Sequence, residues 1–313
     1  MEENSISRRD FFKQLGALAL AASPIMTSLS SLTSCSVGKS REPRLTILHT
    51  NDVHSHIDPF PDSDTNYAGQ GGYARRQTFI DKVREAEGGD NVMVFEAGDM
   101  FQGTPYFNFF HGQLEMQLMN RMHIDAVTIG NHEYDNGLES LYNCMDTANF
   151  PFLSANYVFP DRGAKLVKPY KVFERGGIRV GVFGLGIRLA GLVSPLNCPD
   201  VEFREIIPTA QAVVNTLRHQ EKCQLVIALT HIGLKEVEVG DIMLAKNTTG
   251  IDIILGGHTH TFLSQPELVP DQSGKIVVIN QVGYGGINVG KLQIASVNSK
   301  QLSLLDSQSV NMV

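Results

Sequence analysis

The chain has 313 residues, of which 42% are hydrophobic and 19% are charged, and these proportions are ordinary for a globular protein with a substantial core. Its formal charge is −7, with 33 acidic and 26 basic residues. A net acidic chain argues against a nucleic-acid duplex as the main partner, but it is compatible with a small phosphorylated substrate, because bound cations reverse the local field.

The first 34 residues have the pattern of an export signal and not of a folded element. A twin-arginine motif occupies residues 7–13 (SRRDFFK), and an apolar region follows at residues 15–22. Pro24 and a serine-rich stretch end the apolar run well short of the ~18 residues that a membrane-spanning helix needs. We therefore expect residues 1–34 to be a signal peptide, and the protein to be exported to the periplasm or cell envelope.

Residues 32–35 (LTSC) resemble a bacterial lipobox, the site at which a cysteine receives a lipid anchor. This resemblance would make Cys35 the lipidated first residue of the mature protein and residues 35–43 a polar tether to a membrane. The alternative is an ordinary signal peptide in which the cysteine is a coincidence.

From residue 44 onward, short apolar runs alternate with amphipathic segments, which is the pattern of an α/β fold. The predicted strands are residues 45–48, 92–95, 125–129, 170–173, 178–184, 225–229, 251–255, 276–280, 287–295 and 301–305. The predicted helices are residues 73–87, 114–122, 138–148, 208–222 (with Pro208 at its start) and 239–246. Gly176-Gly177 joins two of the strands and predicts a β-hairpin.

Five of the predicted strands end in motifs that carry Asp, Asn or His. In chain order these motifs are Asp52-Val53-His54, Gly98-Asp99, Gly130-Asn131-His132-Glu133-Tyr134-Asp135, Thr230-His231 and Gly257-His258-Thr259-His260. Each motif alone has an ordinary structural explanation, such as a turn or a helix N-cap. Because the carboxyl ends of strands in an α/β sheet border the same crevice, we expect all five to lie close together.

The side chains of these motifs have the chemistry of a metal centre. Apart from His132 and Asp135, the motifs contain two aspartates, one asparagine and four histidines, which exceed what one ion needs, and mixed oxygen and imidazole donors suit Mn, Zn, Fe or Co. Two neighbouring divalent ions are the usual clamp for hydrolysis of a phosphate ester. His132 and Asp135 are three residues apart, so a helical turn would bring them into contact, and the acid would fix the tautomer of the histidine.

The motifs resemble, in content and order, those of the calcineurin-like metallophosphoesterases. Three stretches are similar to the 5′-nucleotidase branch in particular, which includes UDP-sugar hydrolases and 2′,3′-cyclic phosphodiesterases: Leu48-His49-Thr50-Asn51-Asp52, Gly71-Gly72-Tyr73-Ala74-Arg75 and Gly130-Asn131-His132-Glu133. The resemblance runs from about Arg44 to the C-terminus. It implies a single catalytic domain over residues 44–313, an α/β fold in which a β-sandwich of two mixed sheets is flanked by helices in four layers (α/β/β/α).

The resemblance also implies a role for each motif residue. The implied ligands of a first divalent metal ion are Asp52, His54 and His260. Those of a second are Asn131, His231 and His258, with Asp99 bridging the two ions. Some nucleotidases have a glutamine at the position of His260. His132 would be the catalytic histidine and Asp135 its orienting partner, whereas Glu133 is more typical of a helix-start acid than of a catalyst.

The implied reaction is hydrolysis of a phosphate ester, a 5′-nucleotide above all, by a water activated on two divalent ions. Full 5′-nucleotidases of this family carry a C-terminal nucleoside-binding domain, and we expect none within residues 44–313. A separate polypeptide would then supply base recognition, or the enzyme would have loose specificity. Two alternatives stay open: a thiosulfohydrolase of the sulfur-oxidation type on the same scaffold, and a non-catalytic, metal-binding partner subunit.

Overall fold

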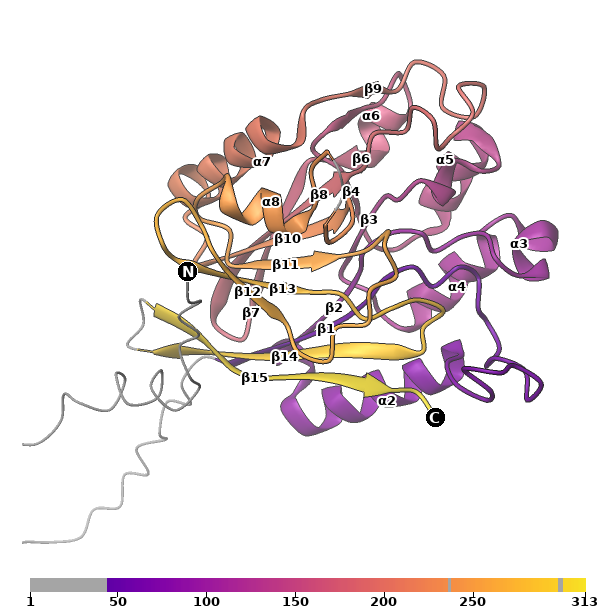
Figure 1. Ribbon diagram of the computed structural model, residues 1–313, viewed down its shortest axis with the longest axis horizontal. Coiled ribbons are helices and arrows are strands. Elements are labelled where there is room, and N and C mark those ends of the chain that lie inside the picture. The colour runs from indigo at the N-terminus through magenta and orange to yellow at the C-terminus, as the bar shows by residue number, and fades with distance from the viewer. Residues whose placement is uncertain (1–43, 236–237, 298–300) are drawn as a thin grey trace, which may run out of the picture. The chain divides into compact units, whose positions relative to one another are not determined.

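Two mixed β-sheets lie face to face at the centre of the fold (Figure 1). The first sheet has seven strands in the order β15 (Gln301–Asn311), β14 (Asn288–Val297), β1 (Arg44–Thr50), β2 (Val92–Glu96), β3 (Ala126–Thr128), β4 (Phe152–Leu153) and β6 (Val167–Lys168). The second has six in the order β12 (Glu267–Pro270), β13 (Ile276–Asn280), β11 (Ile253–Gly256), β10 (Leu225–His231), β8 (Ile178–Gly186) and β7 (Tyr170–Arg175). The predicted hairpin at Gly176-Gly177 joins β7 and β8, which pair antiparallel.

The computed structural model describes residues 44–313 apart from 236–237 and 298–300. The expected signal peptide, the lipidation site Cys35 and the tether lie outside the described residues. These described residues group into one unit. Among the helices of the described ranges, none combines the length and the apolar character needed to cross a membrane.

The core between the sheets consists of aliphatic and aromatic side chains from their central strands. Ile47 and Phe95 of the first sheet belong to the same cluster as Val182, Ile227 and Leu255 of the second, and all five are completely buried. The central strands are parallel and covered on both faces. That burial explains why these segments are continuous apolar runs in the sequence and not alternating ones.

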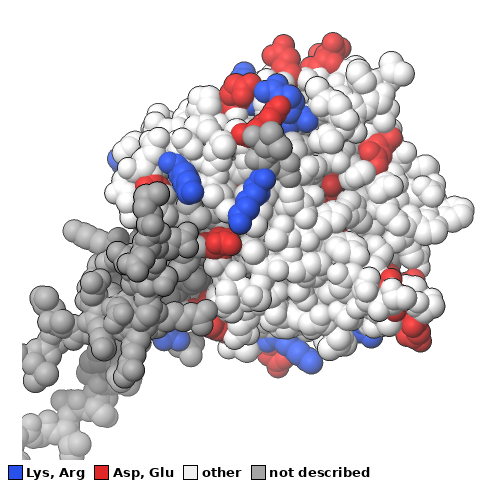
Figure 2. Space-filling model, viewed as in Figure 1, with Lys and Arg blue, Asp and Glu red and all other residues white. Residues whose placement is uncertain are grey.

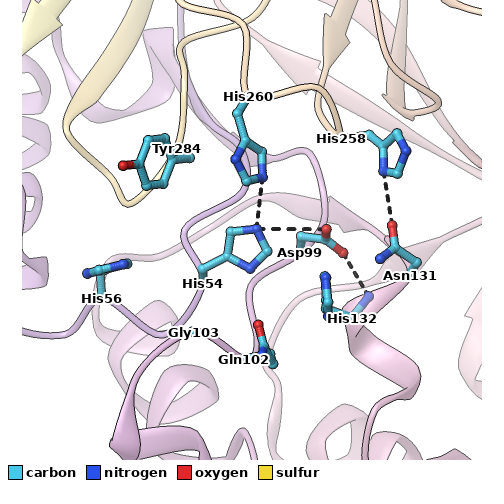
Figure 3. Close-up of a pocket in the computed structure, with 10 residues that line it drawn as sticks. All are labelled: His54, His56, Asp99, Gln102, Gly103, Asn131, His132, His258, His260 and Tyr284. Atoms are coloured by element: carbon cyan, nitrogen blue, oxygen red, sulfur yellow. Dashed lines mark hydrogen bonds and ion pairs between the residues drawn. The ribbon is translucent and has the colours of Figure 1, made fainter. Parts of the chain in front are cut away.

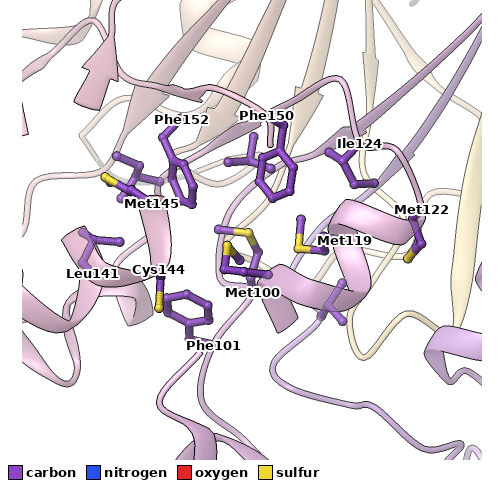
Figure 4. Close-up of a cluster of buried hydrophobic side chains, with 14 of the residues drawn as sticks. Met100, Phe101, Met119, Met122, Ile124, Leu141, Cys144, Met145, Phe150 and Phe152 are labelled. Atoms are coloured by element: carbon purple, nitrogen blue, oxygen red, sulfur yellow. The ribbon is translucent and has the colours of Figure 1, made fainter. Parts of the chain in front are cut away.

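Helices cover the outer faces of both sheets, which gives the four-layer α/β/β/α arrangement that we expected. The helices on the first sheet are α2 (Tyr73–Glu87), α4 (Gln113–Arg121) and α5 (Gly137–Thr147), and those on the second are α7 (Ile206–Asn215) and α8 (Asp241–Lys246). Methionines are frequent beneath α4 and α5, where Met100, Met119 and Met145 pack near Phe150 and Phe152 (Figure 4). Their flexible thioether chains adapt to the irregular space between helix and sheet.

Some elements differ from the prediction. The helix predicted at residues 208–222 begins two residues earlier, at Ile206, and ends in a π-helical turn at Thr216–Gln220. Pro208 fits inside the first turn because the N–H groups there have no partner within the helix. Short elements were not predicted: α3 (Pro105–Phe110), α6 (Gly163–Leu166), β4, β6, β12 and the pair β5 (Tyr157–Val158) and β9 (Glu202–Phe203).

On the molecular face drawn in Figure 2, basic and acidic side chains are interspersed at the top, at the bottom and in the upper left part, and the rest of the face is largely uncharged. A duplex-binding surface would instead gather Lys and Arg into a stripe or patch. The described residues of this face form no such stripe or patch.

Candidate metal centre

The carboxyl ends of five strands meet around a pocket of about 420 Å³ (Figure 3). β1, β2 and β3 are parallel neighbours in the first sheet, and β10 and β11 are parallel neighbours in the second. The polar motifs that end these strands therefore reach the same edge. The pocket is lined by His54, His56, Asp99, Gln102, Gly103, Asn131, His132, His258, His260 and Tyr284.

The first ligand group consists of Asp52, His54 and His260. His260 Nε2 lies 3.0 Å from His54 Nε2 and 3.3 Å from Asp52 Oδ1. Asp52 is completely buried, whereas the side chain of His260 is 40% exposed. Three ligand atoms thus converge on one point. A bound cation would favour this arrangement, because each of these atoms can donate a lone pair to it.

The second ligand group consists of Asp99, His231 and His258, to which Asn131 adds an amide oxygen. Asp99 Oδ2 lies 3.0 Å from His231 Nε2, and Asn131 Oδ1 lies 3.0 Å from His258 Nδ1. The buried Nε2 atom of His231 faces the Asp99 carboxylate, and in the neutral ring whose Nδ1–H donates to Ala97 O both of these atoms are acceptors that cannot bond each other. A buried polar atom without a hydrogen bond costs free energy, and a bound cation would remove that cost.

Asp99 lies between the two groups. Its Oδ2 atom is 3.0 Å from His231 Nε2 and 3.9 Å from His54 Nε2, and its Oδ1 atom accepts a 2.8 Å hydrogen bond from the backbone N–H of His132. Burial raises the pKa of this carboxyl, but the nearby imidazoles, that of His231 first, outweigh burial and hold the pKa well below its usual range. An ionised carboxylate within reach of both groups has the position of a bridging ligand.

Hydrogen bonds to backbone carbonyls orient two of the imidazoles. His54 Nδ1 lies 3.1 Å from Phe101 O, and His231 Nδ1 lies 2.7 Å from Ala97 O. Because a carbonyl oxygen can only accept, the proton of the neutral ring sits on Nδ1, and the Nε2 lone pair faces the centre of the pocket. The donor set of carboxylates, an amide oxygen and correctly oriented imidazoles fits divalent metal ions.

The backbone is strained at most of the expected ligands. Positive φ angles between 49° and 77° occur at Asp52, His54, Asp99, His258 and His260. Each such non-glycine residue costs on the order of 1 kcal/mol or more, and such strain persists only where the surroundings enforce it. Here the strand ends brace one another: the backbone N–H of His54 donates to Asp99 O at 3.0 Å, and that of His258 donates to Asp52 Oδ1 at 3.1 Å.

His132 and Asp135 are in contact beside the ligand groups, as their spacing predicted. A 3₁₀ turn at His132–Tyr134 brings His132 Nδ1 within 2.8 Å of Asp135 Oδ2. The hydrogen bond to Asp135 raises the pKa of His132 above its ordinary value, although partial burial opposes the shift. His132 is one-third exposed and lines the pocket, so a proton on its ring is accessible to a bound substrate.

Glu133 has a structural role that the sequence did not reveal. Its buried carboxylate accepts hydrogen bonds from three backbone N–H groups, those of Asp99 (2.9 Å), Met100 (2.7 Å) and Gly130 (2.6 Å). Burial, followed by the charge of Asp99, raises the pKa of Glu133 to about 7. The side chain therefore ties the loop after β2 to the loop after β3, and these loops carry Asp99 and Asn131.

Two histidines outside the ligand groups, His56 and His49, also lie close to the first motif in the sequence. His56 lines the pocket, in keeping with its proximity to the Asp52-Val53-His54 motif. His49 does not line it: its Nε2 atom lies 3.0 Å from Asn280 Nδ2, and complete burial lowers the pKa of the ring to about 3. Of the aromatic run in α3, Phe107 is buried in the core, whereas Phe109 is 77% exposed.

The sequence profile of the calcineurin-like phosphoesterases matches residues 45–262, which include every residue of both ligand groups. The chain belongs to this family. The family implies divalent metal ions, and the two ligand groups provide donors for them.

Individual members of the family are also similar over most of the chain. A snake venom 5′-nucleotidase from Crotalus adamanteus is 34% identical over 271 residues, which are 80% of this chain and 45% of that protein. The crystal structure of a 5′-nucleotidase precursor from Thermus thermophilus has a TM-score of 0.78 at 32% identity and covers 86% of this chain and 54% of its own. A sulfate thiohydrolase from Thermus thermophilus has a TM-score of 0.71 at 19% identity, over 86% of this chain and 56% of its own, which shows a shared fold alone. This chain thus spans about half the length of each of these three relatives.

Proposed function

We propose that the chain is a metal-dependent phosphoric ester hydrolase that acts on 5′-nucleotides or related nucleotides. The observation that carries the proposal is the convergence of two ligand groups around Asp99, with the His132–Asp135 pair at their side, in one open pocket. Relatives described as 5′-nucleotidases support the choice of a nucleotide as substrate. Because they are about twice as long, we further propose that a second module contributes to recognition of the nucleoside.

The two ligand groups support a specific set of metal-binding residues. Asp52, His54 and His260 would hold one ion, Asn131, His231 and His258 would hold the other, and Asp99 would contact both. When bound, such ions supply a water of lowered pKa as nucleophile and neutralise charge on the phosphoryl oxygens. Mn, Zn, Fe and Co all suit the donor set.

His132 would act on the leaving group. Its Nδ1–H donates to the Asp135 carboxylate, so the ring is fixed in one orientation and the Nε2 atom is left for the substrate. In the protonated ring, Nε2–H can donate a proton to the departing alkoxide or a hydrogen bond to the phosphoryl group. The hydrogen bond to Asp135 favours that protonated form because it raises the pKa of His132.

We also propose export through the twin-arginine motif and a lipid anchor at Cys35. The motifs at residues 7–13 and 32–35 support both. Replacement of Cys35 by Ser should release the protein from the membrane fraction. Continued membrane association of the Cys35→Ser variant would contradict the anchor.

The activity is tested by assaying metal-reconstituted protein against 5′-AMP, a UDP-sugar, a 2′,3′-cyclic nucleotide, p-nitrophenyl phosphate and a thiosulfate ester. We expect release of phosphate from at least one phosphoester, with a high KM for 5′-AMP if the second module is needed. Turnover of the thiosulfate ester alone would replace the proposal by the sulfur-oxidation reaction. No turnover of any substrate by protein that holds two ions would contradict catalysis.

A further inference from the structure

His260 is held differently from the other imidazoles of the ligand groups. His54 and His231 bind backbone carbonyls through Nδ1, and His258 Nδ1 faces Asn131. In His260 the contact is instead made by Nε2, which lies near His54 Nε2. This is the His260 atom that faces the other ligand side chains. Within the described residues, no hydrogen bond to Nδ1 therefore fixes the orientation of the His260 ring.

An aromatic ring takes the place of that hydrogen bond. The ring of Tyr284 stacks on the ring of His260, with centroids 5.1 Å apart and planes inclined by 16°. Tyr284 is itself held by edge contacts with Phe60, Tyr67 and Phe262, at centroid distances of 6.0, 5.7 and 6.0 Å. Figure 3 shows Tyr284 beside His260, on the side of the pocket away from Asn131 and His258.

The loop that carries Tyr284 is bonded to the segments on both sides of the first ligand group. Gly283 O accepts a 2.6 Å hydrogen bond from the Asn51 side chain, and the N–H of Gly283 donates to Thr261 O at 3.0 Å. The N–H of Gly285 donates to Asp52 O at 2.8 Å. The loop is thus hydrogen-bonded to Asn51 and Asp52 on one side and to Thr261, which follows His260, on the other.

Glycines allow the aromatic side chains to pack against this loop. Gly283 has a φ of 87° and Gly285 a φ of 63°, both in the left-handed region that glycine adopts without strain. A Cβ atom at Gly283 would meet the ring of Phe262, and one at Gly285 would meet the ring of Phe60. The loop conformation and the aromatic contacts therefore depend on each other.

We propose that Tyr284 is a positioning residue for the first metal ion, because its stacked ring holds His260 in the orientation that places Nε2 next to Asp52 and His54. This inference rests on the metal-dependent function proposed above. The second ligand group is oriented by hydrogen bonds and has no share in the stack. Loss of the Tyr284 ring should thus weaken the first ion and spare the second.

The test is calorimetric titration of metal-free protein with Mn²⁺, without substrate, for wild type, Tyr284→Leu and Tyr284→Phe. Removal of an outer contact to a metal ligand commonly lowers affinity about 10–100-fold. We expect Tyr284→Leu to lose about tenfold or more at one site and to keep the other, which also shows that the variant is folded. Tyr284→Phe retains the ring and should stay within about threefold of wild type.

A double-mutant cycle shows whether Tyr284 acts through His260. In a His260→Gln background, Tyr284→Leu should cause no further loss of affinity, because the stacked imidazole is gone. Equal losses in both backgrounds, or a Tyr284→Leu variant that binds both ions as wild type does, would overturn the inference. Tyr284→Met repeats the test if the leucine variant does not fold. Because metal affinity is measured without turnover, failure of the proposed hydrolase function would be visible separately, as two bound ions with no activity.

Discussion

The two ligand groups differ in how the fold holds them. In the second group His231 is completely buried, its ring is bonded to Ala97 O, and Glu133 ties the loops of Asp99 and Asn131 together. The first group includes His260, which is 40% exposed and oriented by stacking on Tyr284. Hydrogen bonds to buried backbone define direction more strictly than ring stacking does. We therefore expect the second group to bind its ion more tightly, and the first group to exchange its ion more readily.

Replacement of Asp99 should impair metal binding by both groups, because this carboxylate lies within reach of both. We expect Asp99→Ala to abolish measurable binding of one ion, to weaken the other, and to lower turnover by about 10⁴-fold or more. Metal content by mass spectrometry and phosphate release measure the two effects. Asp58→Asn is the control, since that exposed carboxylate bonds Tyr106 outside both groups. Full activity in Asp99→Ala would contradict the bridging role.

His132 belongs to neither group, so its replacement should lower catalysis and leave the metal affinities of both groups unchanged. General acid catalysis contributes about 10²–10⁴-fold, and we expect His132→Ala to lower kcat within that range. Two ions should remain bound. A loss of metal in parallel with activity would mean that His132 is a ligand and not a proton donor.

Glu133 provides a way to weaken the second group more than the first, because it holds the loops of Asp99 and Asn131. In Glu133→Gln an amide replaces one of the carboxylate oxygens and cannot accept all three backbone hydrogen bonds, so we expect a loss of about 2–4 kcal/mol in the free energy of unfolding. Affinity for the tighter ion should fall about 10–100-fold. Denaturant unfolding and metal titration measure both quantities.

Glu115 is the matched control for this change, because it is just as buried but makes none of those backbone hydrogen bonds. Burial raises its pKa, so a neutral amide is a change in the direction that burial already favours. Glu115→Gln should thus have a much smaller effect than Glu133→Gln. Equal destabilisation by the two variants would show that burial alone, and not the tie between the loops, explains Glu133.

Replacement of His260 should weaken the first group instead of the second, and its effect should be the smallest of those predicted here. His260→Gln keeps a potential oxygen ligand at the same position, so we expect about a tenfold loss of affinity at the weaker site and little change at the tighter one. The control is His219→Gln, because His219 is exposed and lies outside the pocket and both groups. If His260→Gln weakened the tighter site instead, the assignment of the groups to the two affinities would be reversed.

The sequence predicted those parts of the site that lie directly after the ends of strands. Apolar runs located β1, β2, β3, β10 and β11, and the motifs after them supplied both ligand groups. Parallel strands within each sheet then required these motifs to meet. The four layers followed from the resemblance to a known family and are present in the structure.

Other parts depend on contacts that no local pattern encodes. Glu133 looks like an ordinary helix-start acid, and its role arises only because the folded loops point three N–H groups at it. Tyr284 lies in a glycine-rich stretch, and its contact with His260 depends on a loop held between two distant segments. The short strands β5 and β9 have two residues each and pair across the chain, so periodicity could not locate them.

The most direct test of the account is anomalous diffraction from crystals of Mn²⁺-loaded protein. We predict two anomalous peaks, one within bonding distance of Asp52, His54 and His260 and the other of Asn131, His231 and His258, with Asp99 contacting both. At limiting Mn²⁺, the peak of the second group should be the stronger. A single peak, or peaks away from these side chains, would contradict the two-ion centre on which the proposed hydrolysis depends.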